Sequence, residues 1–231
     1  MPFFLSNRQP DLTEQMDRNT CSPVLLENTY RQFSIINKLL SQWKRIYKKE
    51  LRPLLDQKKT YTLLDIGFGG GDVPVQIAKW AFRDRIKLKV TAIDPDQRAI
   101  DFAKKNYPEG VVHWRKCTST DLVLEKEKYD IVISNHLVHH LKNQELLKLL
   151  QEARELASLK VLFNDIERSD LGYSMFNLFS RAWFKDSFIT EDGLTSIKRS
   201  FTLKELQELT TAGWYVERIF PFRLILKYDK T

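Results

Sequence analysis

Glycines and carboxylates are concentrated in one short segment of the chain. The sequence LLDIGFGGGD at 63–72 places three glycines at alternate positions between Asp65 and Asp72. Glycines spaced in this way let the backbone turn sharply and approach a ligand closely. A dinucleotide fingerprint requires another glycine three residues after Gly69, where this chain has Asp72, and an acid there would repel a pyrophosphate. The segment therefore predicts a binding loop for a cationic ligand and disfavours a phosphate.

A second acid follows at a distance that suits a nucleoside. The run VTAIDPD at 90–96 ends an apolar stretch with Asp94. A carboxylate at a strand end, roughly 20 residues beyond a glycine loop, can accept hydrogen bonds from both hydroxyls of a ribose. The glycine loop or the acidic strand end alone is weak evidence for a nucleoside site. The two segments together, in this order, are more specific evidence.

Three of the four histidines follow a later apolar run, at positions 136, 139 and 140. Imidazole titrates near neutral pH, so His139 or His140 could remove a proton from a substrate hydroxyl, with Asp165 orienting the base or contacting the substrate. An architectural role for this stretch is the alternative. The spacing of the histidines could also suit a metal, but no neighbouring cysteine or carboxylate completes a site, so we predict none.

The acids and histidines can form one site only if the fold brings them to the same edge of a sheet. From residue 60 onward, short apolar runs alternate with helical stretches, which is typical of a parallel sheet with helices on both faces. The predicted strands are 61–66, 88–93, 111–115, 129–134 and 160–164, and the predicted helices between them are 73–82, 97–106 and 143–157. Ligands bind at the carboxyl ends of such strands, which is where the acids and histidines fall.

The C-terminal part departs from this alternation. A predicted helix at 202–211 leads into an apolar run at 215–219, and only residues 220–222 separate that run from the next one at 223–227. A parallel crossover needs roughly a dozen residues or more, so the last two strands must be antiparallel.

Two segments lie outside the predicted sheet. Residues 1–52 form a predicted N-terminal helical extension, with apolar residues at helical spacing from 22 to 49 and residues 1–20 poorly structured until docked. Residues 53–231 form the main domain. An aromatic-rich insertion at 168–200 is predicted to be a lid over the site.

Composition narrows the classes of protein that fit. The 231 residues are 42% hydrophobic, and no apolar run approaches the roughly 20 residues that cross a bilayer, so we predict no membrane span. Only Cys21 and Cys117 are present, which indicates a reducing, cytoplasmic location. The net charge is +7, but the basic residues are interspersed with acidic ones. This pattern is typical of solvated helix faces and disfavours nucleic acid as a partner. A homodimer is compatible with these features.

Three segments together resemble a known family. DIGFGGG at 65–71 resembles the D/E-x-G-x-G-x-G motif of class I S-adenosylmethionine-dependent methyltransferases. AIDPD at 92–96 is similar to their ribose-binding strand end, and YDIVISNHLVHHL at 129–141 is similar to their fourth-strand motif. The likeness covers roughly residues 60 to 228. It implies an α/β, Rossmann-like, mostly parallel seven-stranded sheet with a C-terminal antiparallel hairpin.

The resemblance also implies the cofactor, S-adenosylmethionine. Its methionine part is cationic and suits the acids around the glycine loop. The residues that the resemblance places at the cofactor are Asp65, Gly67, Gly69, Gly71, Asp94, Pro95, Thr118 and Asn135.

The lid sequence resembles, more loosely, a bacterial subgroup found around aromatic polyketide and quinone-like metabolism. We expect O-methylation of a small aromatic or polyketide-like acceptor. The alternatives are C-methylation of a quinone precursor, an RNA methyltransferase, a nucleotide-dependent oxidoreductase and a binding protein without turnover. The residues expected at the substrate are Tyr30, Phe33, His136, Arg168, Tyr173 and Arg199, and the expected catalytic residues are His139, His140 and Asp165.

Overall fold

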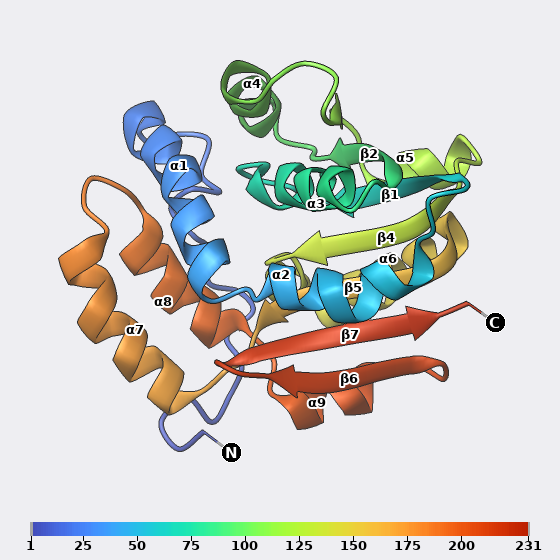
Figure 1. The fold of residues 1–231 in the computed structure, drawn as a ribbon. Helices are drawn as coiled ribbons and strands as arrows, with labels where there is room; N and C mark the ends of the chain where they lie inside the picture. Colours follow the sequence, from blue (N-terminus) through green and yellow to red (C-terminus); the bar gives the residue numbers. More distant parts are fainter. Residues whose placement is uncertain (1, 231) are drawn as a thin grey trace.

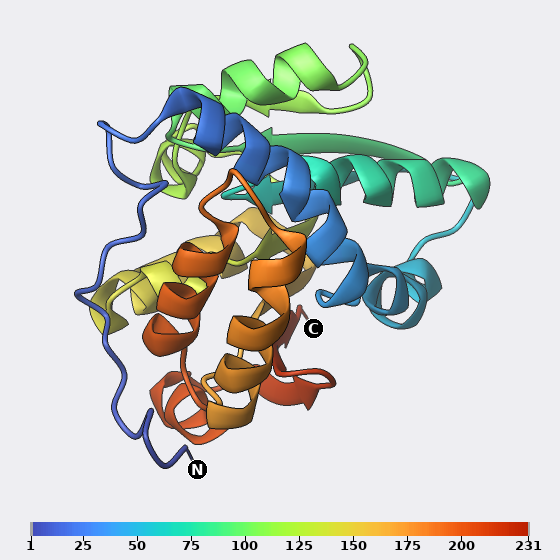
Figure 2. The same cartoon turned by 90° about the vertical axis from the view of Figure 1, so that its left-hand side faces the viewer.

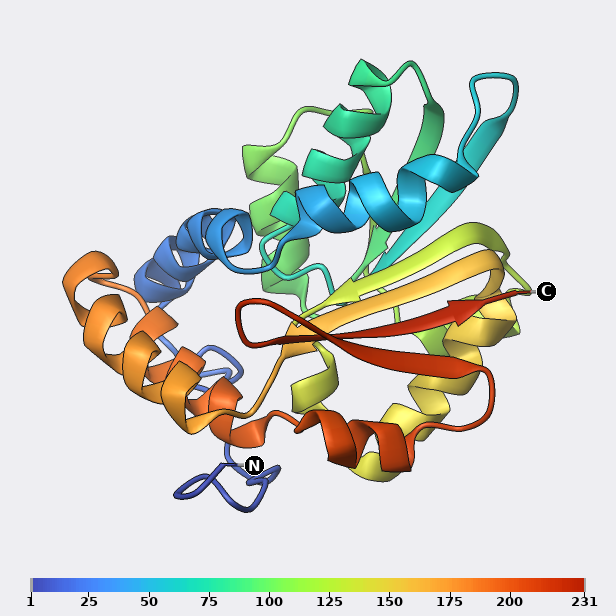
Figure 3. The same cartoon turned by 60° about the horizontal axis from the view of Figure 1, so that its bottom comes forward.

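A seven-stranded sheet with helices on both faces organises the chain (Figure 1). The computed structural model describes residues 2–230. The strand order is β3-β2-β1-β4-β5-β7-β6, and all neighbouring pairs are parallel except those that β7 makes with β5 and β6. The predicted parallel sheet with an antiparallel C-terminal hairpin is confirmed. Figure 3 shows that hairpin at one edge of the sheet.

The elements have the following bounds. The strands are β1 (Thr60–Ile66), β2 (Lys87–Ile93), β3 (His113–Arg115), β4 (Tyr129–Asn135), β5 (Ala157–Ile166), β6 (Trp214–Ile219) and β7 (Arg223–Asp229). The helices are α1 (Pro23–Leu39), α2 (Trp43–Ile46), α3 (Asp72–Arg83), α4 (Gln97–Asn106), α5 (Ser119–Leu124), α6 (Asn143–Leu156), α7 (Asp170–Trp183), α8 (Ile189–Arg199) and α9 (Leu203–Leu209). Short helical turns are η1 (Tyr47–Leu51), η2 (Arg52–Leu54) and η3 (Val138–His140).

The central strands are apolar on both faces because helices cover both. Along β1, Leu63 packs in the core layer beneath α1, α3 and α4, and its neighbour Leu64 packs in the opposite layer beneath α5, α6 and α9. Both side chains are fully buried. This explains why the sequence shows continuous apolar runs here and no polar–apolar alternation.

The N-terminal helix is shorter than its periodicity predicts. The apolar pattern predicts helix from 22 to 49, but α1 ends at Leu39, and Gln42 adopts a left-handed conformation with φ of 56° before α2 begins. Buried hydrogen bonds hold the break, because Ser41 donates to the Asn37 Oδ1 at 2.7 Å and its carbonyl accepts from the Asn164 Nδ2 at 2.6 Å. The break directs α1 across the ends of the strands.

The predicted lid consists of two helices, α7 and α8, packed against each other (Figure 2). Residues 2–21, here called the N-terminal strap, run along α8 on the outer side. Gln9 donates its backbone N–H to the Lys198 carbonyl at 3.0 Å, and Gln15 donates to the Asp192 carboxylate at 2.7 Å. The strap, for which no regular structure is predicted, is therefore docked along its length. Among residues 2–230, no helix has both the length and the apolarity to span a bilayer.

Candidate functional site

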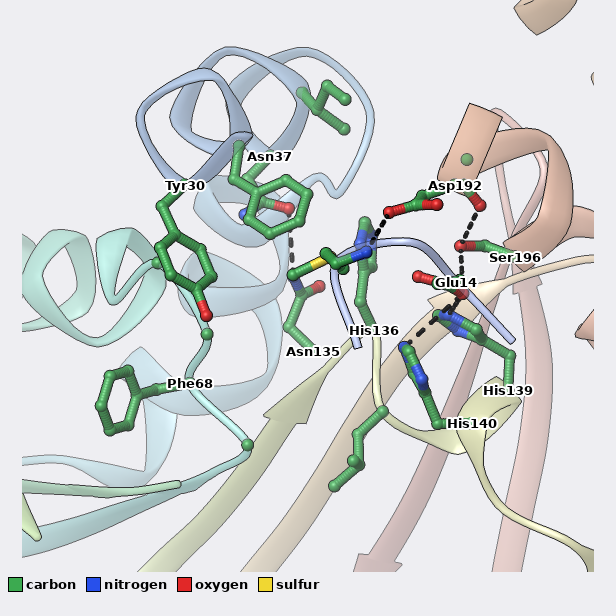
Figure 4. A pocket seen from close by; sticks show the side chains of 18 of the residues that line it. Glu14, Tyr30, Asn37, Phe68, Asn135, His136, His139, His140, Asp192 and Ser196 are labelled. Atoms are coloured by element: carbon green, nitrogen blue, oxygen red, sulfur yellow. Dashed lines mark hydrogen bonds and ion pairs between the residues drawn. The ribbon is translucent and has the colours of Figure 1, made fainter. Parts of the chain in front are cut away.

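A cavity of about 470 Å³ lies at the carboxyl ends of β1, β2 and β4. Its lining also includes residues of α1, α8 and the N-terminal strap, so segments from both ends of the sequence close it (Figure 4). The volume is within the range of small-molecule sites. One end is formed by the glycine loop and the other by the histidines that follow β4.

The glycine loop uses left-handed backbone conformations that glycine adopts readily. Gly67 has φ of 72° and donates its N–H to the Ile93 carbonyl at 2.8 Å, which ties the loop to the end of β2. Gly67, Gly69 and the adjacent Gly70 line the cavity. Gly71, predicted at the cofactor, lies behind the loop instead: it begins α3 and packs beneath the Trp114 ring.

Replacing Gly71 by alanine should destabilise the protein more than the same change at Gly69. Both residues have positive φ, so each alanine carries strain of about 1–2 kcal/mol. A Cβ at Gly71 would lie 2.9 Å from the Trp114 ring, whereas one at Gly69 meets nothing within 4 Å. We expect the clash to add about 1 kcal/mol or more to the loss in free energy of unfolding, measured by urea denaturation. Equal losses in the two variants would contradict this packing.

Two buried acids flank the loop, and neither has a cationic partner among residues 2–230. The Asp65 side chain is 1% exposed, and its Oδ1 has no hydrogen-bond partner within residues 2–230. Burial, with Asp72 and Asp94 nearby, raises the pKa of Asp65 well above its ordinary value. Burial also raises the pKa of Asp72 to about 6, although Asn37 donates to both of its oxygens at 3.0 and 3.1 Å. This end of the cavity would favour a bound cation.

Asp94 joins the glycine loop to the end of β2. Its Oδ2 accepts from the Gly69 N–H at 3.0 Å, and its Oδ1 accepts from the Asp96 N–H at 2.9 Å. Burial raises the pKa of this carboxyl, and both Asp94 and Pro95 line the cavity. Each carboxylate oxygen keeps a second lone pair for a ligand hydroxyl.

Thr118, predicted beside the cofactor, lies outside the cavity lining. It caps α5: its hydroxyl and its backbone N–H both contact the Asp121 carboxylate at 2.8 Å in a capping box. Tyr30 and Phe33, predicted at the substrate, do line the cavity. Tyr30 lies toward the glycine loop, where its backbone carbonyl borders Gly70.

Asn135, the last residue of β4, and His136, which follows it, face the middle of the cavity. Asn135 accepts from the Trp43 Nε1 at 2.9 Å and donates to the Asn37 Oδ1 at 3.0 Å. The His136 Nε2 lies 2.5 Å from the Arg223 Nη1. Burial and the Arg223 charge lower the pKa of His136 well below its ordinary value, so this ring is neutral and accepts that hydrogen bond.

His139 and Asp165 form a buried pair at the wall of the cavity. The His139 Nδ1 lies 2.6 Å from the Asp165 Oδ1, and the His139 backbone N–H donates to the other oxygen at 3.0 Å. Burial alone would lower the pKa of His139, but the carboxylates of Asp165 and Glu14 outweigh the effect of burial and raise the pKa to about 9. His139 lines the cavity and Asp165 does not. Asp165, predicted to be catalytic, therefore lies behind His139 and makes no direct contact with the cavity.

The N-terminal strap contributes two acids to the cavity lining that sequence analysis did not identify as site residues. Glu14 is 3% exposed, and its Oε1 lies 3.4 Å from the His139 Nε2 and 3.8 Å from the His140 Nε2. Asp17 lies 3.3 Å from the His140 Nδ1. Arg199, predicted at the substrate, also lines this end, 3.6 Å from each of the two acids.

No sequence signal identified Glu14 or Asp17, because the strap has no periodic pattern. Asn37 could have been identified, since it shares with Tyr30 and Phe33 one face of the predicted N-terminal helix.

Arg168 and Tyr173, both predicted at the substrate, do not line the cavity. Arg168 is buried among carbonyl groups of the strap and of Ser200 and pairs with Glu205. The Tyr173 ring packs edge-on against Phe4, with centroids 5.7 Å apart. Both residues attach the strap to the lid.

The aromatic residues of the predicted lid divide into two groups. Phe176 lines the cavity, and Phe188 is buried in the core layer that includes α1. Phe179 and Trp183 are 57% and 68% exposed and point away from the cavity. The lid therefore presents only part of its aromatic surface to a ligand.

Comparisons with known proteins agree with this architecture. Residues 63–158 match a family described as a methyltransferase domain. A search of curated protein sequences found no match. Among solved structures, the chain is similar to the plantazolicin methyltransferase BpumL in complex with SAH (TM-score 0.61, 14% identity, covering 90% of this chain and 95% of that one). A SAM-dependent methyltransferase from Aquifex aeolicus gives a TM-score of 0.60 at 17% identity, covering 87% and 96%. Human N-acetylserotonin methyltransferase in complex with SAM gives 0.62 at 10% identity, covering 90% and 56%.

Proposed function

Because the chain contains a methyltransferase domain with the class I, Rossmann-like fold, we propose that it transfers a methyl group from S-adenosylmethionine to a hydroxyl of a small acceptor. One observation carries the proposal. Asp65 and Asp94, at the ends of two adjacent parallel strands, face a single cavity on either side of a glycine loop. That arrangement suits a ligand with a cationic amino-acid part and a ribose.

The cofactor fits the charges of this end of the cavity. Its ammonium group would compensate Asp65, whose Oδ1 is buried and unpaired within residues 2–230, and Asp72 beside it. Asp94 would accept from the ribose hydroxyls with the lone pairs that Gly69 and Asp96 leave free. Asn135, held by Trp43, would border the reacting part of the cofactor.

The other end of the cavity supports a small, largely apolar acceptor. Apolar side chains from α1, α7 and α8 line it: Phe33, Ile36, Phe176, Ile189 and Ile197. The polar cluster that contains Glu14 and His140 lies at this end and would orient one hydroxyl. We favour an aromatic or polyketide-like hydroxyl, with carbon methylation of a quinone precursor as the alternative.

The reaction is an in-line displacement. The acceptor oxygen would attack the methyl carbon, the carbon–sulfur bond would break with its electron pair going to sulfur, and the hydroxyl proton would pass to water. S-adenosylhomocysteine and the methyl ether are the products. The chain mainly has to align the oxygen with the methyl group and exclude water, which alone can supply a large part of the rate enhancement. Residues of the strap and of α8 line the cavity and would contribute to this.

Incubation with methyl-labelled S-adenosylmethionine and an extract of the source cell tests the proposal. Mass spectrometry should find a small metabolite that gains one labelled methyl group, and an Asp94→Ala control should reduce its yield. Label that appears only in RNA or protein, or in no product, would contradict the proposed function.

The affinity for S-adenosylhomocysteine should increase with pH. Burial raises the pKa of Asp72 to about 6 in the free protein, and a bound ammonium group would lower it. Binding then releases a proton, so affinity is lowest under acidic conditions and increases through about pH 6 as Asp72 ionises in the free protein. Ionisation of Asp65, whose pKa burial also raises, adds to the increase. Calorimetry at pH 5 to 8, in buffers of different ionisation enthalpy, measures both the affinity and the number of protons released on binding. An affinity that decreases as the pH increases would contradict the assignment.

A further inference from the structure

Three side chains of metal-ligand type converge at the acceptor end of the cavity. The Glu14 Oε1, the His139 Nε2 and a ring nitrogen of His140 all lie within 4.8 Å of one another (Figure 4). Glu14 belongs to the N-terminal strap and the histidines to η3, so the set exists only when the strap is docked. We propose that these three residues bind a divalent transition-metal ion such as Zn²⁺.

The separations suit ligands of one ion better than a direct hydrogen bond. The Glu14 Oε1 lies 3.4 Å from the His139 Nε2 and 3.8 Å from the His140 Nε2. A charge-assisted hydrogen bond would be about 2.7–2.9 Å long. Two ligands bound tetrahedrally to zinc at about 2.1 Å would lie roughly 3.4 Å apart.

The His139 ring is oriented as in many metal sites. Its Nδ1 faces the Asp165 Oδ1 at 2.6 Å, so the proton that a metal ion would displace from the ring is the one on Nε2, which faces Glu14. That Nε2 is buried, 2% of the side chain being exposed, and it has no hydrogen-bond partner within residues 2–230. A carboxylate behind a ligating histidine fixes its tautomer and increases its basicity.

The carboxylate ligand is also held in place. The Glu14 Oε1 accepts from the Ser196 Oγ at 2.8 Å, which orients it toward the histidines. The Arg199 guanidinium also lies beside Glu14, but its Nη1 is just as far from Asp17, at 3.6 Å, and makes no hydrogen bond to either. The guanidinium can therefore remain beside Asp17 while Glu14 binds the ion.

A site of two histidines and one glutamate leaves a coordination position open for a further ligand. In the cavity that ligand would be the acceptor hydroxyl, whose pKa the ion would lower so that its proton passes to water before the oxygen attacks the methyl carbon. This role rests on the proposed methyl transfer, whereas binding of the ion does not. The structure thus favours the metal site that the histidine spacing alone did not predict.

Calorimetric titration of the tag-free, chelator-treated protein with Zn²⁺ tests the inference. We expect one equivalent to bind, and we expect Glu14→Gln and His140→Ala each to weaken binding at least tenfold. His113→Ala, which removes an exposed histidine on β3, is the matched control and should bind as wild type does. Melting curves would show that the variants fold, and His140→Gln provides a second variant of the same ligand. With Co²⁺, absorption typical of nitrogen and oxygen ligands, without thiolate bands, should appear.

Binding of S-adenosylhomocysteine to the same samples separates the two proposals. Zinc binding without cofactor binding would support the metal site and contradict the proposed function. Cofactor binding without zinc binding would overturn the metal site alone. Zinc binding that Glu14→Gln and both His140 variants leave unchanged would also overturn it, because the ion would then be bound elsewhere.

Discussion

Asp94→Ala is expected to weaken binding of S-adenosylhomocysteine by about 1–3 kcal/mol, or roughly 5- to 150-fold. The substitution removes the acceptor for two ribose hydroxyls. It also frees the backbone N–H groups of Gly69 and Asp96, which hold the glycine loop and the end of β2 in position. Isothermal titration calorimetry measures the change directly.

Two further variants isolate the cause. Asp94→Asn keeps one acceptor oxygen and should bind with intermediate affinity. Asp101→Ala removes an exposed aspartate on α4 that bonds only to Gln97, and it should leave binding unchanged. Wild-type affinity in Asp94→Ala would exclude this carboxylate from the cofactor site.

Arg168→Ala should lower the free energy of unfolding by about 3 kcal/mol or more. The guanidinium has five N–H donors, and all five are used: they reach the carbonyls of Leu5, Ser6 and Ser200 and both oxygens of Glu205, at 2.5–3.2 Å. With 2% of the residue exposed, water cannot replace the lost donors without opening the contact between strap and lid. Urea denaturation followed by circular dichroism gives the magnitude.

The matched control is Arg181→Ala on α7, where the arginine is exposed and bonds to Asn177. It should change stability by less than about 0.5 kcal/mol. Under conditions where Arg168→Ala stays folded, its KM for the acceptor should match that of the wild type. A variant of full stability with an increased KM would restore Arg168 to the substrate site.

The sheet and the cofactor end could be predicted from sequence because local patterns encode them. Continuous apolar runs in β1 and β4 follow from burial on both faces, and glycines at positive φ mark the loop where the backbone must approach a ligand. In parallel strands such signals fall at one edge of the sheet. For this reason the sequence could place Asp65 and Asp94 at the edge of the sheet that borders the cavity.

The acceptor end could not be predicted because tertiary contacts determine it. Glu14 reaches the histidines only through docking of a strap that has no periodicity. Arg168 carries no local sign that its five donors face three carbonyls and the Glu205 carboxylate and not a substrate. Thr118 shows a related error. A threonine followed three residues later by an acid is a helix cap, and that local role displaced the expected cofactor contact.

The most direct test of the central claim is a crystal structure of the protein in complex with S-adenosylhomocysteine. The account predicts the ammonium group within hydrogen-bond distance of Asp65 and the ribose hydroxyls on Asp94, with the thioether sulfur facing the cavity beside Asn135. An empty crevice at the glycine loop, or a phosphate-bearing ligand preferred there over S-adenosylhomocysteine, would contradict it.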